Sequence, residues 1–303
     1  MPYNTFSLFG ASAFLLYVLR TAYYRHYIKR CRRNLKGKVV CITGATGGLG
    51  EAIALEAASL GCRLVLVGRS QDKLTAIADR LCLGEDNVAI VQLDFSNLDD
   101  ISIKADQIFS SFNKLDFVIH NAGIGFRGDA STTSFDIHND LMIVDYFSHV
   151  LLTTALLQHV NKARQRCHFI AISSVQGKLA IPYRSAYAAA KHAMNAYFDS
   201  LRAECEAKSD RIKVTVVSPG YIKTQLGNSA IFGGSESIPR DDLSRGMSPE
   251  YISRVIVDNA MCWKQRDLII APIHHRLAII CRVLFPDLYF YFMKMRASSA
   301  LHR

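Results

Sequence analysis

The feature that most constrains this fold is a glycine-rich turn near residue 45, held between two short apolar runs. Val39–Thr43 has the length and composition of a buried strand, and the turn TGATGGLG occupies 43–50. A segment with helical apolar spacing and a second apolar run at 64–67 follow. This order of strand, turn, helix and strand is the context of a dinucleotide fingerprint, because glycines let the backbone approach a pyrophosphate and the helix N-terminus offers free N–H groups. The sequence therefore predicts the first unit of a Rossmann-type α/β fold.

The rest of the chain continues the alternation of strands and helices. We predict further strands at 88–93, 115–120, 168–173, 211–218 and 268–271, and helices at 71–81 and 134–159. Such alternation favours a parallel sheet covered by helices on both faces. The prediction is one doubly wound parallel sheet in a three-layer αβα arrangement over residues 38–271. Within it, 227–246 loses periodicity; a long structureless stretch in a compact domain is usually functional, which suggests a substrate flap.

A tyrosine and a lysine stand four residues apart in the helix-forming stretch SAYAAAKHAMNAYFDSLRAE. Because residues i and i+4 share a helix face, the ammonium of Lys191 would lie near the phenol of Tyr187 and lower its pKa toward neutrality. Such a phenol could exchange a proton at physiological pH. Ser174 directly follows the apolar run HFIAIS, so its hydroxyl would point into the ligand crevice of an open α/β sheet. Alone, a Tyr-x-x-x-Lys pair is typical of a solvated helix face. The neighbouring motifs decide between a solvated face and a catalytic pair.

The spacing T-G-x-x-x-G-x-G at 43–50, together with Ser174, Tyr187 and Lys191, resembles the short-chain dehydrogenase/reductase family. The match runs from about Val39 to Arg296, and AISSVQGKLAIPYRSAYAAAKHAMNAYFDSLRAE and VTVVSPGYIKT are similar to a membrane-anchored branch of that family. The resemblance implies hydride transfer between a nicotinamide cofactor and a carbonyl or alcohol. It makes Ser174 the group that binds and stabilises the substrate carbonyl oxygen, Tyr187 the acid or base, and Lys191 the group that lowers the Tyr187 pKa and holds the nicotinamide ribose.

The resemblance also assigns the residues that line the cofactor. Asn121-Ala122-Gly123 matches the family's N-A-G turn, Asp94 would lie near the adenine, and the turn after the 211–218 strand would contact the carboxamide side of the nicotinamide. The alternative for Asp94 is an N-terminal cap of the next helix. The implied cofactor-binding set is Thr43, Gly44, Thr46, Gly48, Leu49, Gly50, Arg69, Asp94, Asn121, Ala122, Gly123, Tyr187, Lys191, Pro219, Gly220, Ile222 and Thr224.

The end of the second strand indicates which nicotinamide cofactor binds. An acidic residue there would bind the ribose hydroxyls of NAD, whereas an arginine would accommodate a 2′-phosphate. This chain has Gly68 where the family places the acid, and Arg69 follows it. The alternative is a surface arginine at a helix start. We predict NADP(H) rather than NAD.

One residue departs from the family pattern. Asp145 stands where the family has an active-site asparagine, whose backbone carbonyl holds a water linked to the catalytic lysine. An aspartate keeps that carbonyl but adds a carboxylate close to Lys191, which would stabilise the ammonium and weaken its influence on Tyr187. Altered pH dependence or reduced activity are the two expected outcomes.

The N-terminal segment is uncharged from residue 5 to 19 and is followed by a basic run. Fifteen residues fall short of the ~20 that span a bilayer, but residues 21–24 and a snorkelling Arg20 would complete a span. We therefore predict a single-pass signal-anchor at 1–24 and a basic juxtamembrane linker at 25–37, with the following domain facing the cytosol. The alternative is a helix docked on the protein itself.

The net charge of +10 belongs to that basic run. Eight of the 36 lysines and arginines lie between Arg20 and Lys38, and the rest of the chain has 28 basic against 26 acidic residues. This balance excludes a nucleic-acid surface. The eight cysteines form no C-x-x-C pair, so no metal site is predicted, and with the absence of an N-x-S/T sequon they favour a reducing compartment.

The tail, 272–303, mixes aromatic and aliphatic residues with arginine and lysine, and Pro286 divides it into two short amphipathic pieces. It is either a second membrane contact beside the pocket or an ordinary packing or dimer surface, and the residues do not separate these alternatives.

Together these features predict a membrane-associated NADP(H)-dependent oxidoreductase of lipid metabolism that interconverts a carbonyl and an alcohol. The membrane location suggests a lipophilic substrate: a steroid, a retinoid or a lipid ketone. The predicted partners are that substrate, membrane lipid and a second copy in a homodimer, with no nucleic acid; the endoplasmic reticulum is favoured over the peroxisome. The alternative function is a catalytically weak or inactive membrane-tethered protein that binds the cofactor as a sensor or scaffold.

Overall fold

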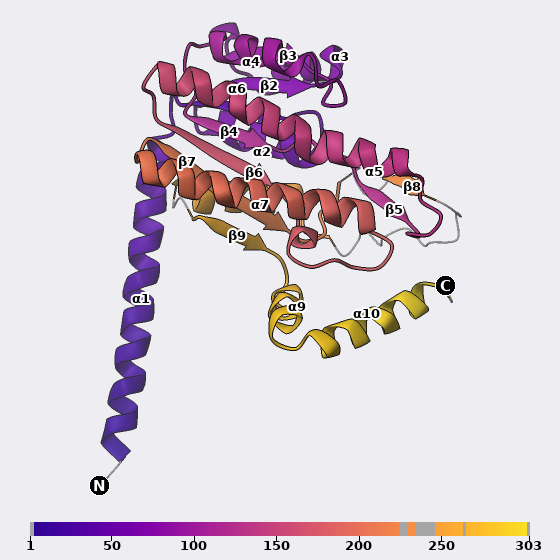
Figure 1. The fold of residues 1–303 in the computed structure, drawn as a ribbon. Helices are drawn as coiled ribbons and strands as arrows, with labels where there is room; N and C mark the ends of the chain where they lie inside the picture. Colours follow the sequence, from indigo (N-terminus) through magenta and orange to yellow (C-terminus); the bar gives the residue numbers. More distant parts are fainter. Residues whose placement is uncertain (1–2, 225–229, 234–245, 263–264, 302–303) are drawn as a thin grey trace.

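A seven-stranded parallel sheet forms the centre of the protein in the computed structural model, which describes residues 3–224, 230–233, 246–262 and 265–301, with side chains from Leu16 to Ala300. The strand order is β3-β2-β1-β4-β6-β7-β9 (Figure 1). The doubly wound parallel sheet predicted from the sequence is confirmed. The strands are β1 (Val39–Thr43), β2 (Arg63–Gly68), β3 (Val88–Gln92), β4 (Phe117–His120), β6 (Cys167–Ile172), β7 (Ile212–Pro219) and β9 (Asp267–Ile270).

Alternate side chains of the strands enter two separate cores. Val40 and Ile42 of β1 face one core, whereas Val39 and Cys41 face the other. The first core is covered by α2 (Gly48–Ser59), α3 (Gln71–Arg80), α8 (Pro249–Ile256) and the π-helical turn η6 (Val257–Cys262). The second is covered by α4 (Ile101–Ser110), α6 (Ser148–Lys162) and α7 (Ser185–Lys208). Burial on both faces explains why the strands are continuous apolar runs.

The chain reverses its direction of sheet growth between β1 and β4. From β1 it adds β2 and β3 on one side, and then crosses over to place β4 on the other side of β1. Ligands of doubly wound sheets bind outside the carboxyl ends of the strands at such a point. The glycine-rich turn after β1 and the N-A-G turn after β4 both lie there.

The long helix expected at 134–159 forms, but with an irregular turn inside it. α5 (Phe135–Met142) passes through the π-helical turn η2 (Ile143–Phe147) into α6. Among the described residues, the continuous helix Phe135–Lys162 is the one stretch long and apolar enough to cross a bilayer. Its buried residues pack against the sheet and α4, which makes it a core helix of this domain.

The predicted flap contains more regular structure than its composition suggested. β8 (Ile231–Gly233) pairs in parallel with β5 (Phe126–Gly128), which follows the N-A-G turn. The pairing depends on glycine, because a Cβ added to Gly128 would lie 2.4 Å from the carbonyl oxygen of Gly233. The expectation of a fully irregular stretch was therefore wrong at this strand. Residues 227–229 and 234–245 of the predicted flap lie outside the described residues.

The N-terminal helix α1 (Tyr3–Arg33) projects from the body, and its last turns pack on the domain (Figure 1). Ile28 is buried, the Tyr24 hydroxyl donates to Asn259 Oδ1 over 3.0 Å, and Arg32 pairs with Asp258 and Glu56. The segment expected to be a juxtamembrane linker is thus helical to Arg33 and fixed by these contacts.

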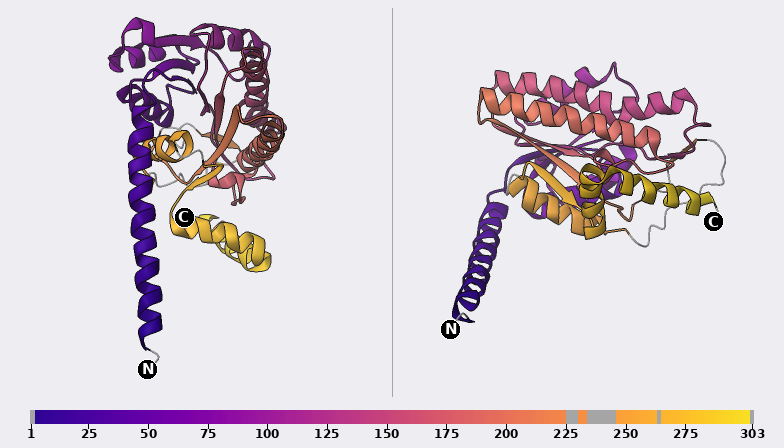
Figure 2. Two further views of the ribbon diagram at one scale, coloured as in Figure 1. Left: turned by 90° about the vertical axis from the view of Figure 1, so that its left-hand side faces the viewer. Right: turned by 60° about the horizontal axis from the view of Figure 1, so that its bottom comes forward.

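The C-terminal tail forms two helices, α9 (Ile273–Leu284) and α10 (Pro286–Leu301), divided at Pro286 as predicted. Both lie on the side of the body from which α1 projects (Figure 2). Two 3₁₀ turns, η1 (Glu85–Asn87) and η3 (Val175–Gly177), complete the described elements.

Candidate active site

The glycine-rich turn and the N-A-G turn are locked together by neutral hydrogen bonds. The Thr43 hydroxyl oxygen accepts the backbone N–H groups of Asn121 (2.9 Å) and Ala122 (3.0 Å). In return, the Asn121 side-chain amide donates to the carbonyls of Thr43 and Gly44, both over 3.1 Å. These reciprocal bonds fix the ends of β1 and β4 against each other.

Two glycines of the turn are required by space. Gly44 has φ of +63°, and a Cβ on it would lie 2.8 Å from Cα of Ala122. A Cβ on Gly50 would lie 2.2 Å from the Gly44 carbonyl oxygen, and one on Gly48 would lie 3.0 Å from a methyl group of Thr224. Real Cβ contacts essentially never fall below 3.0 Å, so the turn requires glycine at Gly44 and Gly50, whereas a side chain at Gly48 would require Thr224 to shift.

The N-terminus of α2 has the features of an anion site. Its N-cap, Gly47, provides no side-chain hydrogen bond, and the one acidic residue of its first turn, Glu51, pairs with Arg80. Free N–H groups and the positive end of the helix dipole therefore remain for a phosphate. Leu49 packs its side chain into the core, so only its backbone can serve such a ligand.

The residues expected near the adenosine half lie beside this turn. The Thr46 hydroxyl would be 3.5 Å from a Cβ on Gly68, and the exposed Arg69 comes next in the chain. Asp94 accepts the backbone N–H and hydroxyl of Ser96 over 2.9 and 2.8 Å, so it stabilises its own turn. The alternative of a cap for the next helix was wrong, because Asp100 occupies the N-cap of α4.

The turn after β7 is held in place by contacts with β9 and with Met247. The Gly220 N–H donates to the Ile270 carbonyl of β9 over 2.9 Å, and Ile222 forms an isolated bridge with Met247. Pro219 is the last residue of β7. Thr224 of this predicted group reaches the glycine turn, since a Cβ on Gly48 would lie 3.0 Å from its methyl group.

Ser174, Tyr187 and Lys191 come together at the carboxyl end of β6. The Ser174 hydroxyl oxygen accepts the Gln176 N–H over 3.1 Å, which leaves its proton free to donate, and it hydrogen-bonds Tyr187. Tyr187 and Lys191 share one face of α7, with Nζ 5.6 Å from the centre of the phenol ring. Lys191 is almost fully buried.

Asp145 reaches this group from the π-helical turn η2. Its Oδ1 accepts the Ile124 N–H over 2.8 Å, and its Oδ2 lies 3.5 Å from Lys191 Nζ. Both side chains are buried. The predicted carboxylate beside Lys191 is therefore present, and it forms a direct ion pair. A Cβ on Gly123 would lie 2.9 Å from Asp145 Oδ1, so this carboxylate also requires the glycine of the N-A-G turn.

The electrostatics of the group differ from the prediction in one respect. Burial opposes the phenolate and raises the pKa of Tyr187 above its usual 10; the Asp145 charge raises it further, while the Lys191 charge and the Ser174 hydrogen bond only partly offset this. The predicted net lowering of the Tyr187 pKa was wrong, because desolvation outweighs one cationic neighbour. Burial lowers the pKa of Lys191, but Asp145 and Tyr187 outweigh it and raise that pKa. Burial raises the pKa of Asp145 despite Lys191.

A buried histidine pair behind the N-A-G turn was missed. His149 Nε2 lies 2.9 Å from the Ala122 carbonyl, so it must carry a proton and donate, which makes His149 Nδ1 an acceptor. His120 Nδ1, 3.1 Å away, then donates to it, and Thr153 donates to His120 Nε2 over 2.9 Å. This relay of neutral groups fixes the carbonyl of Ala122. The signal in the sequence was the i+4 spacing of Asp145, His149 and Thr153 on one helix face.

Comparisons with known proteins show the family of this chain. The family model described as short chain dehydrogenase matches residues 38–231. A dehydrogenase/reductase SDR family protein 7-like from Anopheles gambiae is 42% identical over 278 residues, covering 89% of this chain and 86% of its own length. Dehydrogenase/reductase SDR family member 7B from Bos taurus is 39% identical over 276 residues, with 88% and 84% covered.

Solved structures show the same fold. A short chain dehydrogenase/reductase from Burkholderia phymatum in complex with NAD has a TM-score of 0.72 at 22% identity, covering 84% of this chain and 95% of its own. An alcohol dehydrogenase from Thermococcus sibiricus in complex with 5-hydroxy-NADP has a TM-score of 0.66 at 24% identity, covering 78% and 96%.

Proposed function

Because the chain belongs to the short-chain dehydrogenase/reductase family, we propose that it is an NADP(H)-dependent oxidoreductase that interconverts a carbonyl and an alcohol on a lipophilic substrate. The observation that carries the proposal is the position of Lys191, whose Nζ lies 5.6 Å from the centre of the Tyr187 ring and packs beside Gly123 of the N-A-G turn. Few arrangements other than proton exchange with a bound substrate explain a phenol, a hydroxyl and a buried ammonium at one crevice.

The chain's own residues supply the proton chemistry. The Ser174 hydroxyl donates a hydrogen bond to the carbonyl oxygen, which stabilises the negative charge that develops there. Tyr187 transfers its phenolic proton to that oxygen, and its raised pKa keeps the phenol protonated at neutral pH, which favours carbonyl reduction. Lys191 limits the charge cost of the phenolate. The nicotinamide supplies the hydride.

The crevice suits a dinucleotide, because the glycines leave no Cβ between the backbone and a pyrophosphate and the α2 N-terminus has no side-chain cap. The backbone of Gly48, Leu49 and Gly50 would hold the pyrophosphate, Thr46 and Arg69 the adenosine side, and Ile222 and Thr224 the carboxamide side. Gly68 and Arg69 support NADP(H) over NAD, because an arginine at the end of β2 can bind a 2′-phosphate.

A lipophilic substrate and a membrane location are supported by α1 and by the apolar tail. We place the protein as a single-pass protein facing the cytosol, in the endoplasmic reticulum rather than the peroxisome, and as a homodimer. Fractionation of cells and light scattering of the purified protein test these assignments.

The test of activity is NADPH oxidation by the full chain in detergent, with steroid, retinoid and lipid ketones set against small polar carbonyls. We expect lipid ketones to be reduced, and Tyr187→Phe to lose about 10²- to 10⁴-fold in kcat while binding NADPH as the parent does. Tyr251→Phe is the matched control, since it removes the same phenolic hydroxyl from an exposed place on α8. Faster reduction of small polar carbonyls than of lipid ketones would refute the substrate class.

The second candidate, a tethered cofactor-binding protein without turnover, is favoured by the Asp145–Lys191 ion pair. An ammonium neutralised by a buried carboxylate has less effect on Tyr187. If the parent and Asp145→Asn both bind NADPH but reduce no carbonyl in the panel, the protein is a sensor or scaffold.

A further inference from the structure

The two tail helices expose an apolar surface that the described part of the chain leaves uncovered. Ile273, Leu277, Ile280 and Leu284 follow one side of α9 and are 52–69% exposed. Phe290 and Phe292 of α10 are 53% and 52% exposed. So many large apolar side chains on one short hairpin exclude the ordinary packing considered from the sequence, because packing within the chain would have buried them.

The charges of the tail select a class of partner. Between residues 272 and 301 the sequence has one acidic residue, Asp287, and four basic residues: Arg276, Arg282, Lys294 and Arg296. The Arg282 guanidinium lies 4.8 Å from the centre of the Phe290 ring, so its charge sits within the apolar surface. Aromatic rings with arginines and lysines among them are typical of helices that lie at a bilayer interface with anionic headgroups.

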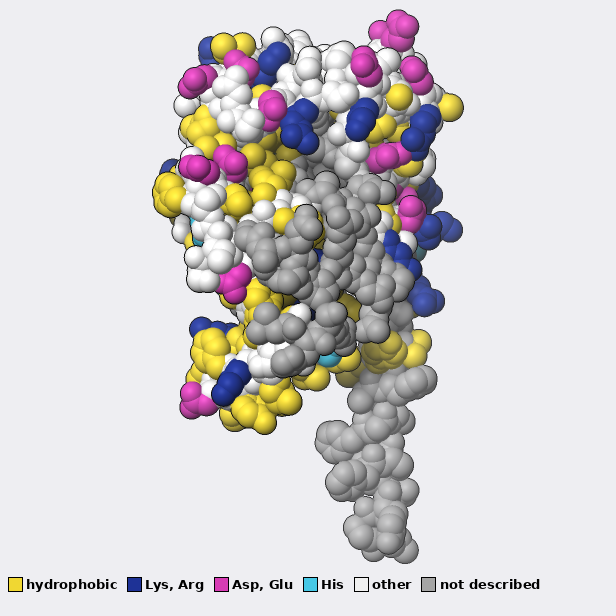
Figure 3. Space-filling model, turned by 90° about the vertical axis from the view of Figure 1, so that its right-hand side faces the viewer, with side chains coloured by type: hydrophobic (Ala, Val, Ile, Leu, Met, Phe, Trp, Pro, Cys, Tyr) yellow, Lys and Arg dark blue, Asp and Glu magenta, His cyan; other side chains and the backbone are white. Residues whose placement is uncertain are grey.

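The location of the tail agrees with a bilayer. α1 and the α9–α10 hairpin lie on the same side of the body in Figure 1 and in the left view of Figure 2. Hydrophobic side chains gather over the hairpin in the space-filling view (Figure 3). Leu16, Tyr17 and Leu19 of α1 are also exposed, 57–67%. A flat partner on this side would contact both α1 and the hairpin, and a bilayer is such a partner.

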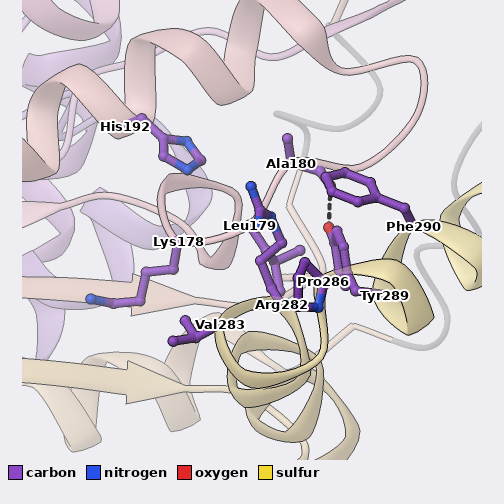
Figure 4. Close-up of a pocket in the computed structure, with 9 residues that line it drawn as sticks. All are labelled: Lys178, Leu179, Ala180, His192, Arg282, Val283, Pro286, Tyr289 and Phe290. Atoms are coloured by element: carbon purple, nitrogen blue, oxygen red, sulfur yellow. Dashed lines mark hydrogen bonds between the residues drawn. The ribbon is translucent and has the colours of Figure 1, made fainter.

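The hairpin is attached to segments that border the candidate active site. The Tyr289 hydroxyl donates to the Ala180 carbonyl, six residues after Ser174 (Figure 4). The Tyr183 hydroxyl, four residues before Tyr187, donates to the Ala297 carbonyl over 3.3 Å, and Arg296 contacts the Tyr221 hydroxyl over 3.3 Å. A hollow of about 390 Å³ separates α9 and α10 from the segment after Ser174.

We propose that α9 and α10 dock on the surface of an anionic lipid bilayer and hold the border of the active site against it, so that the substrate enters from the lipid. The entry of substrate rests on the proposed function, whereas the docking does not. Docking is independent of turnover and is measured without it. A second copy of this chain on the same surface is the competing outcome.

The experiment places the full chain, one copy per disc, in nanodiscs of phosphatidylcholine and phosphatidylserine. A polarity-sensitive dye is attached at Ile280→Cys, in a background in which the exposed Cys82 and the partly exposed Cys31, Cys205 and Cys281 are changed to serine. Ile103→Cys is the matched control, because Ile103 is similarly exposed (60% against 52%) on α4, away from the tail (Figure 1). Discs with brominated acyl chains are compared with unbrominated discs.

We expect bromination to quench the dye at 280 about twofold or more and to leave the dye at 103 unchanged, because an interfacial helix buries its apolar face at the acyl boundary. The same quenching is expected in the Tyr187→Phe background, which separates docking from activity. An unquenched dye at 280, or a chain that does not associate with the discs, would overturn the proposal. So would a dye at 280 that responds only when two copies share a disc, which would assign the surface to a dimer.

A second measurement links docking to substrate entry. Ile280→Asp is expected to raise KM for a lipid ketone in the disc about tenfold, without changing kcat or the KM of a water-soluble carbonyl, because a charged residue at the interface opposes docking. An equal change for both substrates would show that the substitution acts on the active site itself and would overturn the coupling.

Discussion

The two sides of the candidate active site, one at the carboxyl end of β1 and one on α7, are built by different physics. On the side of β1, the glycine turn is held by neutral hydrogen bonds from Thr43 and Asn121. On the side of α7, Lys191 and Asp145 are buried charges 3.5 Å apart beside a phenol. The stability of neutral groups whose hydrogen bonds are satisfied depends on spacing and volume. The protonation of buried charged groups depends instead on the balance between desolvation and the charge of each neighbour. The first side should therefore be sensitive to added atoms, and the second to removed charge.

The largest effect is expected at Gly50. Its added Cβ would meet a backbone oxygen at 2.2 Å, so Gly50→Ala should lower the free energy of unfolding by about 3 kcal/mol and weaken NADPH binding. Gly47→Ala is the matched control, because its Cβ would lie 3.4 Å from the same oxygen. Urea unfolding and fluorescence titration with NADPH measure both effects. Equal losses in the two variants would show that space does not govern this side.

The next effect tests a charge on the glycine side, that of Arg69. Arg69→Ala should weaken NADPH binding about 10- to 100-fold, the worth of a hydrogen bond to a charged group, and leave NADH binding unchanged. The exposed Lys73, on α3 nearby, is the control, because its removal changes the net charge equally. Calorimetric titration with both nucleotides decides the matter. A uniform loss for NADPH and NADH would contradict recognition of a 2′-phosphate.

The same division explains what the sequence could predict. The seven strands of the central sheet, the glycine turn and the Tyr187–Lys191 pair follow from patterns among neighbouring residues, and all were found. β8 was missed because its pairing with β5 depends on close contact between glycines a hundred residues apart. The direction of the Tyr187 pKa was also missed. It depends on how deeply several distant segments bury the phenol, and no local pattern reports this.

The third effect concerns the histidine relay between the two sides. Burial lowers the pKa of His120 to about 3, and burial together with the neighbouring His120 and the charge of Lys191 holds that of His149 well below 6.5. The unfolded chain binds these protons near pH 6.5, so stability is full above that pH and is lost as the pH falls toward 3. Each histidine contributes about 1.4 kcal/mol per pH unit in this window. Urea unfolding at pH 6.5 and pH 5 should therefore show a smaller loss for His120→Asn, by about 2 kcal/mol.

Thr153→Val is the control for that measurement. It keeps both histidines but removes the hydroxyl that donates to His120, so it should lower stability by about 1 kcal/mol at every pH and leave the slope unchanged. If the free energy of unfolding fell equally with pH in His120→Asn and in the parent, His120 would be protonated in the folded protein, contrary to the relay.

The smallest effect, about one pH unit, is expected at Asp145. Asparagine keeps the shape and can still accept the Ile124 N–H, but it removes the charge that raises the pKa values of both Lys191 and Tyr187. Alcohol oxidation needs the phenolate and rises with pH through the Tyr187 pKa, while carbonyl reduction needs the phenol and falls there. Both limbs should therefore move to lower pH in Asp145→Asn, as measured from profiles of kcat/KM.

Asp140→Asn is the matched control, since it removes the same charge from an exposed place on the same continuous helix, where water screens it. A shift of equal size in both variants would mean that net charge, and not the buried pair, sets the profile. If Asp145→Asn gained turnover without any shift, the carboxylate would act by holding Lys191 away from Tyr187. The α7 side of the crevice would then be governed by geometry, like the β1 side, and the contrast between them would fail.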